Sequence, residues 1–379
     1  MGFLSGRVTA RRFTVGGPRP DPFGEADLDR LRATAGGSGV AAADGSEAGW
    51  GGGAHALDGD FDLAKNVVGG DALAFDLRID TDRPPADLVK AYYAVELKAL
   101  AAGNPSGLPS AKQKREAKEA ARERVEHEAK DGRFRRRTRV PVLWDRASGE
   151  AWLGATSHAV AGRFETLFAA AFGRDLAAVS AGTRAGAGGA AAGCLSAVVP
   201  GVTPEEPFWA SGGAADWLGN EWLLWLWWHG EAGGDTLRLP DGSEATYMLA
   251  RELVCDCPAG VSGLDTFRHE GPGRMPEAKR AAVAGKLPRK AGLTVVRHGD
   301  QYEFAVQAET LAVTGGRVPG ADDDAPAAER PVARVEAVRG LMAAADLLYG
   351  AFLAARVGRD WPDTLAAMQR WLAGGEGVA

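Results

Sequence analysis

The chain has 379 residues, of which 45% are hydrophobic and 25% charged, and its formal net charge is −6. This balance is ordinary for a globular protein and excludes wholesale disorder, and the length suits two or three domains. The three cysteines, Cys194, Cys255 and Cys257, are too few for a disulfide framework, and Cys255-Asp-Cys257 lacks the further ligands of a zinc site. We therefore expect free, buried thiols in a reducing compartment, with no metal and no cofactor.

The beginning of the chain, MGFLSGRVTARRF, lacks the apolar core of a signal peptide. No uncharged stretch reaches the ~20 apolar residues that are needed to span a bilayer. We therefore expect a cytoplasmic protein without a membrane partner.

The first region, residues 1–105, is predicted to be an α+β unit. In ALAFDLRID (72–80) apolar residues alternate with polar ones, which predicts a half-buried strand. Pro84-Pro85 then opens a helix that Gly103 stops. Two further elements are expected upstream, a strand over residues 3–15 and an amphipathic helix over 25–34.

The second region, residues 106–176, is predicted to contain a helix, a β-hairpin and a second helix. Ser110 with Gln113 three residues later is a capping box, and Gly132 is a stop signal. VPVLWD, the turn RASG and EAWLGA then form the hairpin, and HAVAGRFETLFAAAFG is amphipathic.

The third region, residues 177–316, is predicted to be a second α+β unit with a Trp-rich segment. Its Ala/Gly/Pro-rich start (181–216) predicts a loop, and GLDTFRHEGPGRMP (263–276) predicts another. TYMLARELVC, LTVVRHG and QYEFAVQAE predict strands. EWLLWLWWHG (221–230) is too continuously apolar for an exposed base-stacking platform, so we expect it in the core or at a protomer contact.

The last region, residues 317–379, is predicted to combine an acidic linker with C-terminal helices. VPGADDDAPAAERP contains prolines and a run of acids, which is typical of a linker. Apolar residues at helical spacing follow between Val335 and Leu372.

The basic run from Lys112 to Arg139 stands out in this acidic chain. It holds 12 Lys and Arg against 6 Asp and Glu, a formal charge of +6, so the remaining residues sum to −12. One interpretation is a solvated helix that pairs its own charges at i,i+4 spacing, as in Lys112/Glu116, Arg115/Glu119, Arg122/Glu126 and Arg124/Glu128.

Two features favour an anionic partner instead. Lys114, Lys118 and Arg122 form a like-charged row on one helix face, and the run of arginines from Arg133 to Arg139 contains no acid. Clustered cations suit the phosphates of duplex DNA. Since no base-reading module is recognisable, the contact is expected with the backbone, independent of sequence.

A second basic cluster lies far along the chain. It comprises Arg268, His269 and Arg274 in the predicted loop and Lys279, Arg280, Lys286, Arg289 and Lys290 after it, with Glu277 as the only acid among the latter. Its plainest interpretation is a solvated helix and turn. Two such clusters together favour an anionic ligand more than either does alone.

A nuclease is the enzymatic alternative. Asp80 with Glu96-Leu97-Lys98 imitates the acid-x-Lys signature of metal-dependent nucleases. That chemistry requires Glu and Lys on a strand beside the Asp, whereas AYYAVELKALAA is predicted to be a helix, where residues two apart do not face each other. We find no GxSxG and no GxxxxGK[ST] loop, so we expect no catalytic residues.

The order of these features is similar to that of a known family. SAKQKREAKEAARERVEHEAKDGRF leads to VPVLWDRASGEAWLGATSHAVAGRFETLFAAAFG, and FRHEGPGRMPEAKRAAVAGKLPRKAGLTVVRHGDQYEFAV and a helical C-terminus follow. Together they resemble a divergent branch of the recombination-associated RdgC family, over most of the chain and by pattern more than by an invariant motif.

The resemblance implies an α+β fold with antiparallel sheets, assembled as a ring-like homodimer whose basic hole encircles duplex DNA. It also implies association with the nucleoid and restraint of the RecA recombinase. Phe134 would contact the other protomer. Carried onto this chain, the DNA-contacting residues would be Lys112, Lys114, Arg115, Lys118, Arg122, Arg133, Arg135, Arg136, Arg137, Arg268, Lys286, Arg289 and Lys290. A metal-dependent exonuclease and a scaffold that does not bind DNA remain as alternatives.

Overall fold

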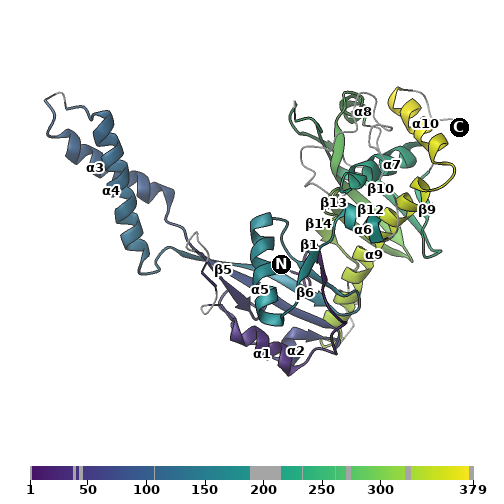
Figure 1. The fold of residues 1–379 in the computed structure, drawn as a ribbon, viewed down its shortest axis with the longest axis horizontal. Helices are drawn as coiled ribbons and strands as arrows, with labels where there is room; N and C mark the ends of the chain where they lie inside the picture. Colours follow the sequence, from purple (N-terminus) through teal and green to yellow (C-terminus); the bar gives the residue numbers. More distant parts are fainter. Residues whose placement is uncertain are drawn as a thin grey trace. The chain divides into compact units, whose positions relative to one another are not determined.

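The computed structural model describes residues 2–36, 40–41, 46–105, 107–187, 215–232, 234–260, 262–269, 275–320 and 326–374. These residues form a mixed α+β fold with extensive antiparallel sheet and a helical C-terminus, as predicted (Figure 1). The chain divides into two compact units. The larger unit comprises Met1–Asp27, Asp62–Ala74 and Pro141–Ala379, and the smaller one Leu28–Phe61 and Phe75–Val140.

The larger unit is built on a sheet whose neighbouring strands run antiparallel in the order β11-β10-β12-β13-β14-β1-β7. His298 and Gly299 join β12 to β13, and both have positive φ, as a two-residue type I′ turn requires. The strands are β1 (Val8–Val15), β4 (Val67–Val68), β7 (Glu150–Leu153), β8 (Leu176–Ala178), β9 (Thr236–Arg238), β10 (Glu244–Asp256), β11 (Asp265–His269), β12 (Leu287–Arg297), β13 (Asp300–Gln307) and β14 (Val313–Arg317).

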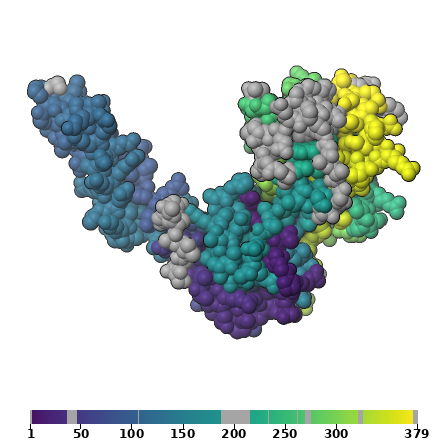
Figure 2. Space-filling model, in the orientation of Figure 1, coloured from purple at the N-terminus to yellow at the C-terminus, as the bar shows by residue number. Residues whose placement is uncertain are grey.

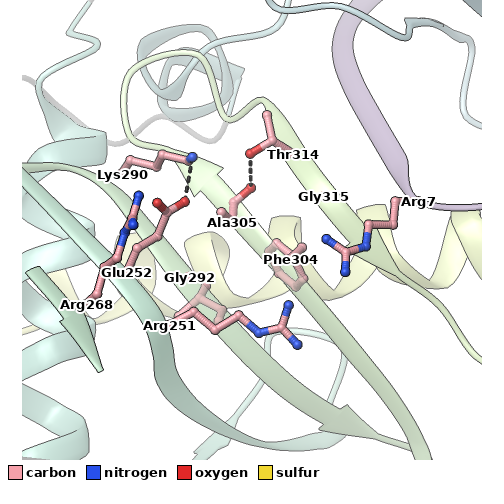
Figure 3. A pocket seen from close by; sticks show the side chains of 11 residues that line it. Arg7, Arg251, Glu252, Arg268, Lys290, Gly292, Phe304, Ala305, Thr314 and Gly315 are labelled. Carbon is pink, nitrogen blue, oxygen red and sulfur yellow. Dashed lines mark hydrogen bonds and ion pairs between the residues drawn. The ribbon is translucent and has the colours of Figure 1, made fainter. Parts of the chain in front are cut away.

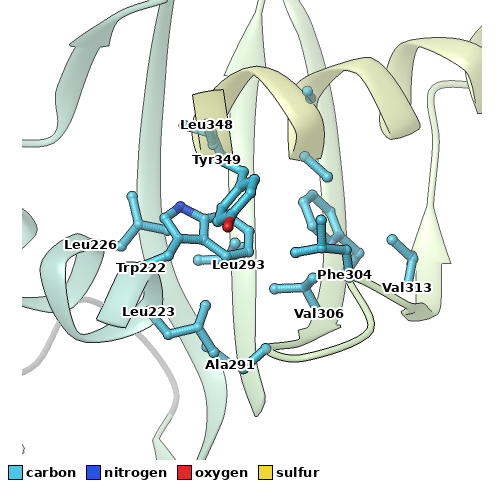
Figure 4. Packing of buried hydrophobic residues seen from close by; sticks show 14 of the residues in the cluster. Trp222, Leu223, Leu226, Ala291, Leu293, Phe304, Val306, Val313, Leu348 and Tyr349 are labelled. Atoms are coloured by element: carbon cyan, nitrogen blue, oxygen red, sulfur yellow. The ribbon is translucent and has the colours of Figure 1, made fainter. Parts of the chain in front are cut away.

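Helices α7 (Leu218–Ala232), α9 (Arg330–Arg356) and α10 (Trp361–Leu372) enclose the main core. In Figure 4, Trp222 of α7 packs against Leu293 of β12 and Tyr349 of α9, and the two aromatic rings lie 5.2 Å apart. Trp222, Trp225 and Trp227 are fully buried. The predicted core role of the Trp-rich segment is thereby confirmed.

Helix α9 is apolar and long enough to cross a membrane, judged by length and composition alone. Half of the most apolar 18-residue stretch of this helix is buried inside the protein. Val338, Leu341 and Phe352 are among the buried residues of the helix. This pattern is that of a core helix lying on a sheet.

A second aromatic layer forms around Trp144. The predicted hairpin is present, since the end of β6 (Arg135–Asp145) pairs with β7. Phe168 and Phe172 of α5 (His158–Phe172) pack edge-on against Trp144, with ring centroids 5.1 and 5.0 Å away. The remaining helices of the larger unit are α2 (Leu63–Asn66), α6 (Ala181–Ala187) and α8 (Pro276–Val283).

The smaller unit combines a short antiparallel sheet with a helical hairpin. Strand β3 pairs with both β2 and β5, and Trp50 of β3 packs at 5.0 Å on Phe75 of β5. Helices α3 and α4 pack side by side (Figure 1), and their atoms are drawn in blue in Figure 2. The elements are β2 (Val40–Ala41), β3 (Glu47–Gly51), β5 (Ala72–Asp82), α3 (Ala86–Ala101) and α4 (Ala111–Ala129), together with most of α1 (Glu25–Ala33) and the start of β6.

Several sequence-based boundaries were wrong. Strand β5 was predicted to be half-buried, but the side chains on both of its faces are mostly buried. Its polar residues Asp76 and Asp80 form ion pairs instead of facing solvent. The first strand begins only at Val8, residues 181–187 form α6, and 265–269 form β11. The segment 188–214 lies outside the described residues, as do Cys194 and Arg274.

Candidate nucleic-acid interface

Helix α4 begins at the predicted capping box. The Ser110 hydroxyl accepts a hydrogen bond from the backbone N–H of Gln113 at 3.2 Å, and the Gln113 side chain accepts one from the Ser110 N–H at 2.8 Å. Ala117, Ala121 and Val125, one turn apart, are buried against α3. This buried stripe fixes which face of α4 remains open.

The open face carries cations. Lys114, Lys118 and Arg122 recur at i,i+4 spacing and are exposed, as is Arg115 beside them. None of the four has an ion-pair or hydrogen-bond partner in the described part of the chain. Uncompensated like charges one turn apart destabilise a helix unless an anion meets them.

The expected self-pairing of this helix is largely absent. Of the four i,i+4 pairs, only Lys112 and Glu116 lie within range, at 3.7 Å. Arg124 reaches across to α3 instead, where it lies 3.7 Å from Glu96 and over the ring of Tyr92. Arg124 therefore contacts residues of α3 in place of Glu128, the partner that the i,i+4 spacing on α4 predicted for it.

The arginines that follow α4 are mostly occupied. Arg133 binds Asp131, and Arg135 bridges Glu47 and Asp80. Arg137 lies 3.7 Å from Asp80. Arg136 alone among the predicted arginines of this run is exposed and has no partner within the described residues.

The acids of β5 show why these arginines are held. Burial raises the pKa of Asp80, but hydrogen bonding and charge from Arg78 and Arg135 outweigh it, so the pKa lies below its usual range. Burial has the largest effect on Asp76 and raises the pKa of its carboxyl, although Arg139 lies 2.7 Å away.

Phe134, which precedes β6, is half-buried, and its carbonyl accepts a hydrogen bond from the Arg83 N–H at 3.1 Å.

The second basic cluster is also divided between paired and open cations. Lys286 binds Asp265 at 2.7 Å with a side chain only 12% exposed, and Arg289 binds Glu309 at 2.9 Å. Lys290 binds Glu252 at 2.5 Å. Arg268 is exposed, and the described residues offer it no partner. Since Lys286, Arg289 and Lys290 lie at or beside the start of β12, the predicted helix and turn end before them.

Arg268 and Lys290 line a cavity of about 340 Å³ in the larger unit (Figure 3). Its other charged residues are Arg7, Arg251 and Glu252. The sequence did not point to Arg7 and Arg251, because neither lies in a basic run and only β-sheet pairing brings them to the same cavity as Arg268.

The residues of the nuclease alternative are not assembled into a metal site. Asp80 is held by arginines, and Glu96 and Lys98 lie on helix α3, as the sequence predicted. Among the residues that the structure describes, no group of three His, Cys, Asp or Glu side chains could hold a metal ion. Cys255 and Cys257 are buried and form no disulfide, as expected, and burial raises the pKa of the Cys255 thiol to about 12.

Comparison of the sequence with models of known protein families finds no match, and comparison with curated proteins finds none either.

Proposed function

We propose that the protein binds double-stranded DNA through its phosphate backbone, independent of base sequence, and that the open face of α4 is the main contact. The observation that carries the proposal is the row Lys114, Lys118 and Arg122, exposed and without partners in the described structure. At 1.5 Å rise per residue these cations are about 6 Å apart along the helix and cover about 12 Å. Such a row can neutralise successive phosphates and release their condensed counterions.

The net charge of −6 does not oppose this contact. At physiological salt the interaction between exposed charges is screened beyond about 8 Å, so the local charge of α4 governs the encounter. The acids elsewhere would repel DNA only where it comes close to them, and would thus help to orient the duplex on α4.

The resemblance to the RdgC family extends the proposal. Two copies would close into a ring around the duplex, slow its release, and obstruct the growth of RecA filaments in the nucleoid. The helical hairpin supports a role in assembly, because α3 has no fully buried residue and Val95 is 57% exposed. Phe134, half-buried among arginines, is proposed as a further protomer contact. The activity requires neither a cofactor nor a catalytic residue.

Binding of duplexes over a series of salt concentrations tests the proposal. Two duplexes of equal length and unrelated sequence should give the same affinity. The logarithm of the association constant should fall with the logarithm of salt with a slope of about −3.6 if only the four open cations of α4 contribute. Mg²⁺ is present and the length of the DNA is checked afterwards. Absence of binding at low salt contradicts the proposal, and shortened DNA supports the exonuclease instead.

A further inference from the structure

The cavity in the larger unit is lined by residues with short or absent side chains at matching positions on three strands. Gly292 of β12 pairs with Ala305 of β13, which in turn pairs with Thr314 of β14. Their neighbours Leu293 and Phe304 point to the helix-covered face and join the core, so the short residues face the opposite side. We call the depression above them the sheet hollow.

A β-bulge forms one wall of the sheet hollow. Between the pairs Leu249↔Leu293 and Leu253↔Ala291, β10 advances four residues while β12 advances two. Within this bulge Arg251 has a φ of 71°, which is strained for a residue with a side chain. A Cβ on Gly292 would lie 2.0 Å from the Ala250 carbonyl oxygen, so the bulge requires glycine there. Bulges of this kind commonly redirect side chains beside functional sites.

Strand pairing brings the charged residues around the hollow from several elements. Glu252 pairs with Arg268 across β10 and β11, and the pairing of Val8 with Gly316 brings Arg7 beside β14. In Figure 3, Arg7 and Arg251 extend their guanidinium groups toward each other at one end of the hollow. Arg268 lies beside the pair of Lys290 and Glu252 at the other end.

Two of these four cations are uncompensated. Lys290 binds Glu252, and Arg251 binds Glu303, which also binds Arg317 at 3.3 Å. Arg7 and Arg268 are exposed and have no partner among the described residues. The hollow therefore carries one uncompensated cation at each of its two ends.

We propose that the sheet hollow is a phosphate-binding site, occupied by backbone phosphates of a nucleic acid. Arginine side chains match phosphate oxygens with their planar fork of donors. Because Arg7 and Arg268 lie at opposite ends of the hollow, each would contact a different phosphate of one backbone. The assignment to a nucleic acid rests on the proposed function, whereas the phosphate chemistry rests on the hollow alone.

Three variants test the site. Arg7→Gln with Arg268→Gln removes the two open charges without breaking an ion pair, and Ala305→Glu places a carboxylate on the floor. Arg370→Gln is the control, because Arg370 is exposed on α10, without a partner in the described part of the chain, and α10 packs on the helices of the core face.

Duplex affinity is measured for each variant over the same salt series. The double variant should bind roughly tenfold or more weakly and lose about two from the salt slope, since each phosphate contact adds about one. Ala305→Glu should weaken binding similarly, and Arg370→Gln should bind as the unmodified protein does. Thermal unfolding without ligand should leave the double variant unchanged, which excludes misfolding as the cause.

Inorganic phosphate distinguishes the possible sources of the ligand. Phosphate, compared with chloride at equal ionic strength, should raise the melting temperature of the unmodified protein but not of the double variant. If phosphate alone shows this difference and DNA binding does not, the site binds free phosphate. If neither assay separates the double variant from Arg370→Gln, the inference is overturned. Should the double variant bind DNA normally while charge removal on α4 abolishes binding, the proposed function stands without this site.

Discussion

Helix α4 and the start of strand β6 carry consecutive parts of one basic run but place their charges in different surroundings. On α4, Lys114, Lys118 and Arg122 face solvent without partners within the described residues. On β6, Arg135, Arg137 and Arg139 recur at every second residue and therefore share one face of the strand. These three arginines meet acids, at 3.2 and 3.7 Å from Asp80 and 2.7 Å from Asp76.

The difference follows from what lies beside each element. Alternation in β5 puts Asp76 and Asp80 on one face, and Glu47 of β3 pairs directly with Asp80. Two neighbouring carboxylates would repel each other, and Arg135 binds both. Helix α4 buries Ala117, Ala121 and Val125 against α3, and among the described residues no acid pairs with Lys114, Lys118 or Arg122. Charge on the strand therefore stabilises the fold, while charge on the helix is free for a ligand.

Removing charge from each element separately should produce the largest contrast. Lys114→Gln, Lys118→Gln and Arg122→Gln together should reduce the salt slope by about three and weaken duplex binding about 100-fold or more. Stability should hardly change, since Gln is as good a helix former as Lys and Arg.

The matched variant is Arg135→Gln with Arg137→Gln. It should change DNA affinity little and should destabilise the smaller unit, because Asp80 would keep only Arg78 as a close partner. Binding titrations and native-state hydrogen exchange read the two effects separately. Equal losses of DNA affinity in both variants would show that the strand arginines also contact the duplex.

Asp80→Asn should be the next largest change. Truncating one partner of a fully buried ion pair costs about 3–5 kcal/mol. The arginines around Asp80 are 16% to 40% exposed, so we expect a smaller loss of about 2 kcal/mol. The same substitution releases Arg137, while Arg135 keeps Glu47 as its partner, and DNA affinity should rise. A variant that is destabilised without binding DNA more tightly would show that the released arginine cannot reach the duplex.

The pH dependence of this loss has a definite sign. The folded pKa of Asp80 is lowered, so its carboxylate stabilises the fold fully above the ordinary carboxyl pKa of about 4. As the pH falls below that value, the carboxyl takes up a proton and the contribution is lost. Hydrogen exchange of β5 should therefore differ between the unmodified protein and Asp80→Asn at pH 7 and converge toward pH 3. A difference that grows as the pH falls would contradict this assignment.

The sequence predicts the features that depend on neighbours along the chain. The capping box at Ser110, the hairpin of β6 and β7 and the buried Trp222 follow from local pattern. Whether a cation is paired does not follow from local pattern, because its partner can lie far away in the sequence. Arg135, for example, binds Glu47, which lies 88 residues upstream. The sheet hollow cannot be predicted from the sequence for the same reason, since the pairing of β1 with β14 brings Arg7 to it.

The smallest change tests whether α4 must be ordered from its first turn. Ser110→Ala removes a cap of about 1 kcal/mol, and hydrogen exchange should accelerate in the first turn of α4, with Ser262→Ala, at an exposed position, as the control. Lys118 and Arg122 lie beyond that turn, so duplex affinity should fall less than twofold, a loss far below that of the triple variant. Electrostatic contact with a flexible lysine tolerates fraying, whereas a geometric contact does not. A loss approaching that of the triple variant would therefore mean that DNA recognises the shape of the capped helix and not merely its charge.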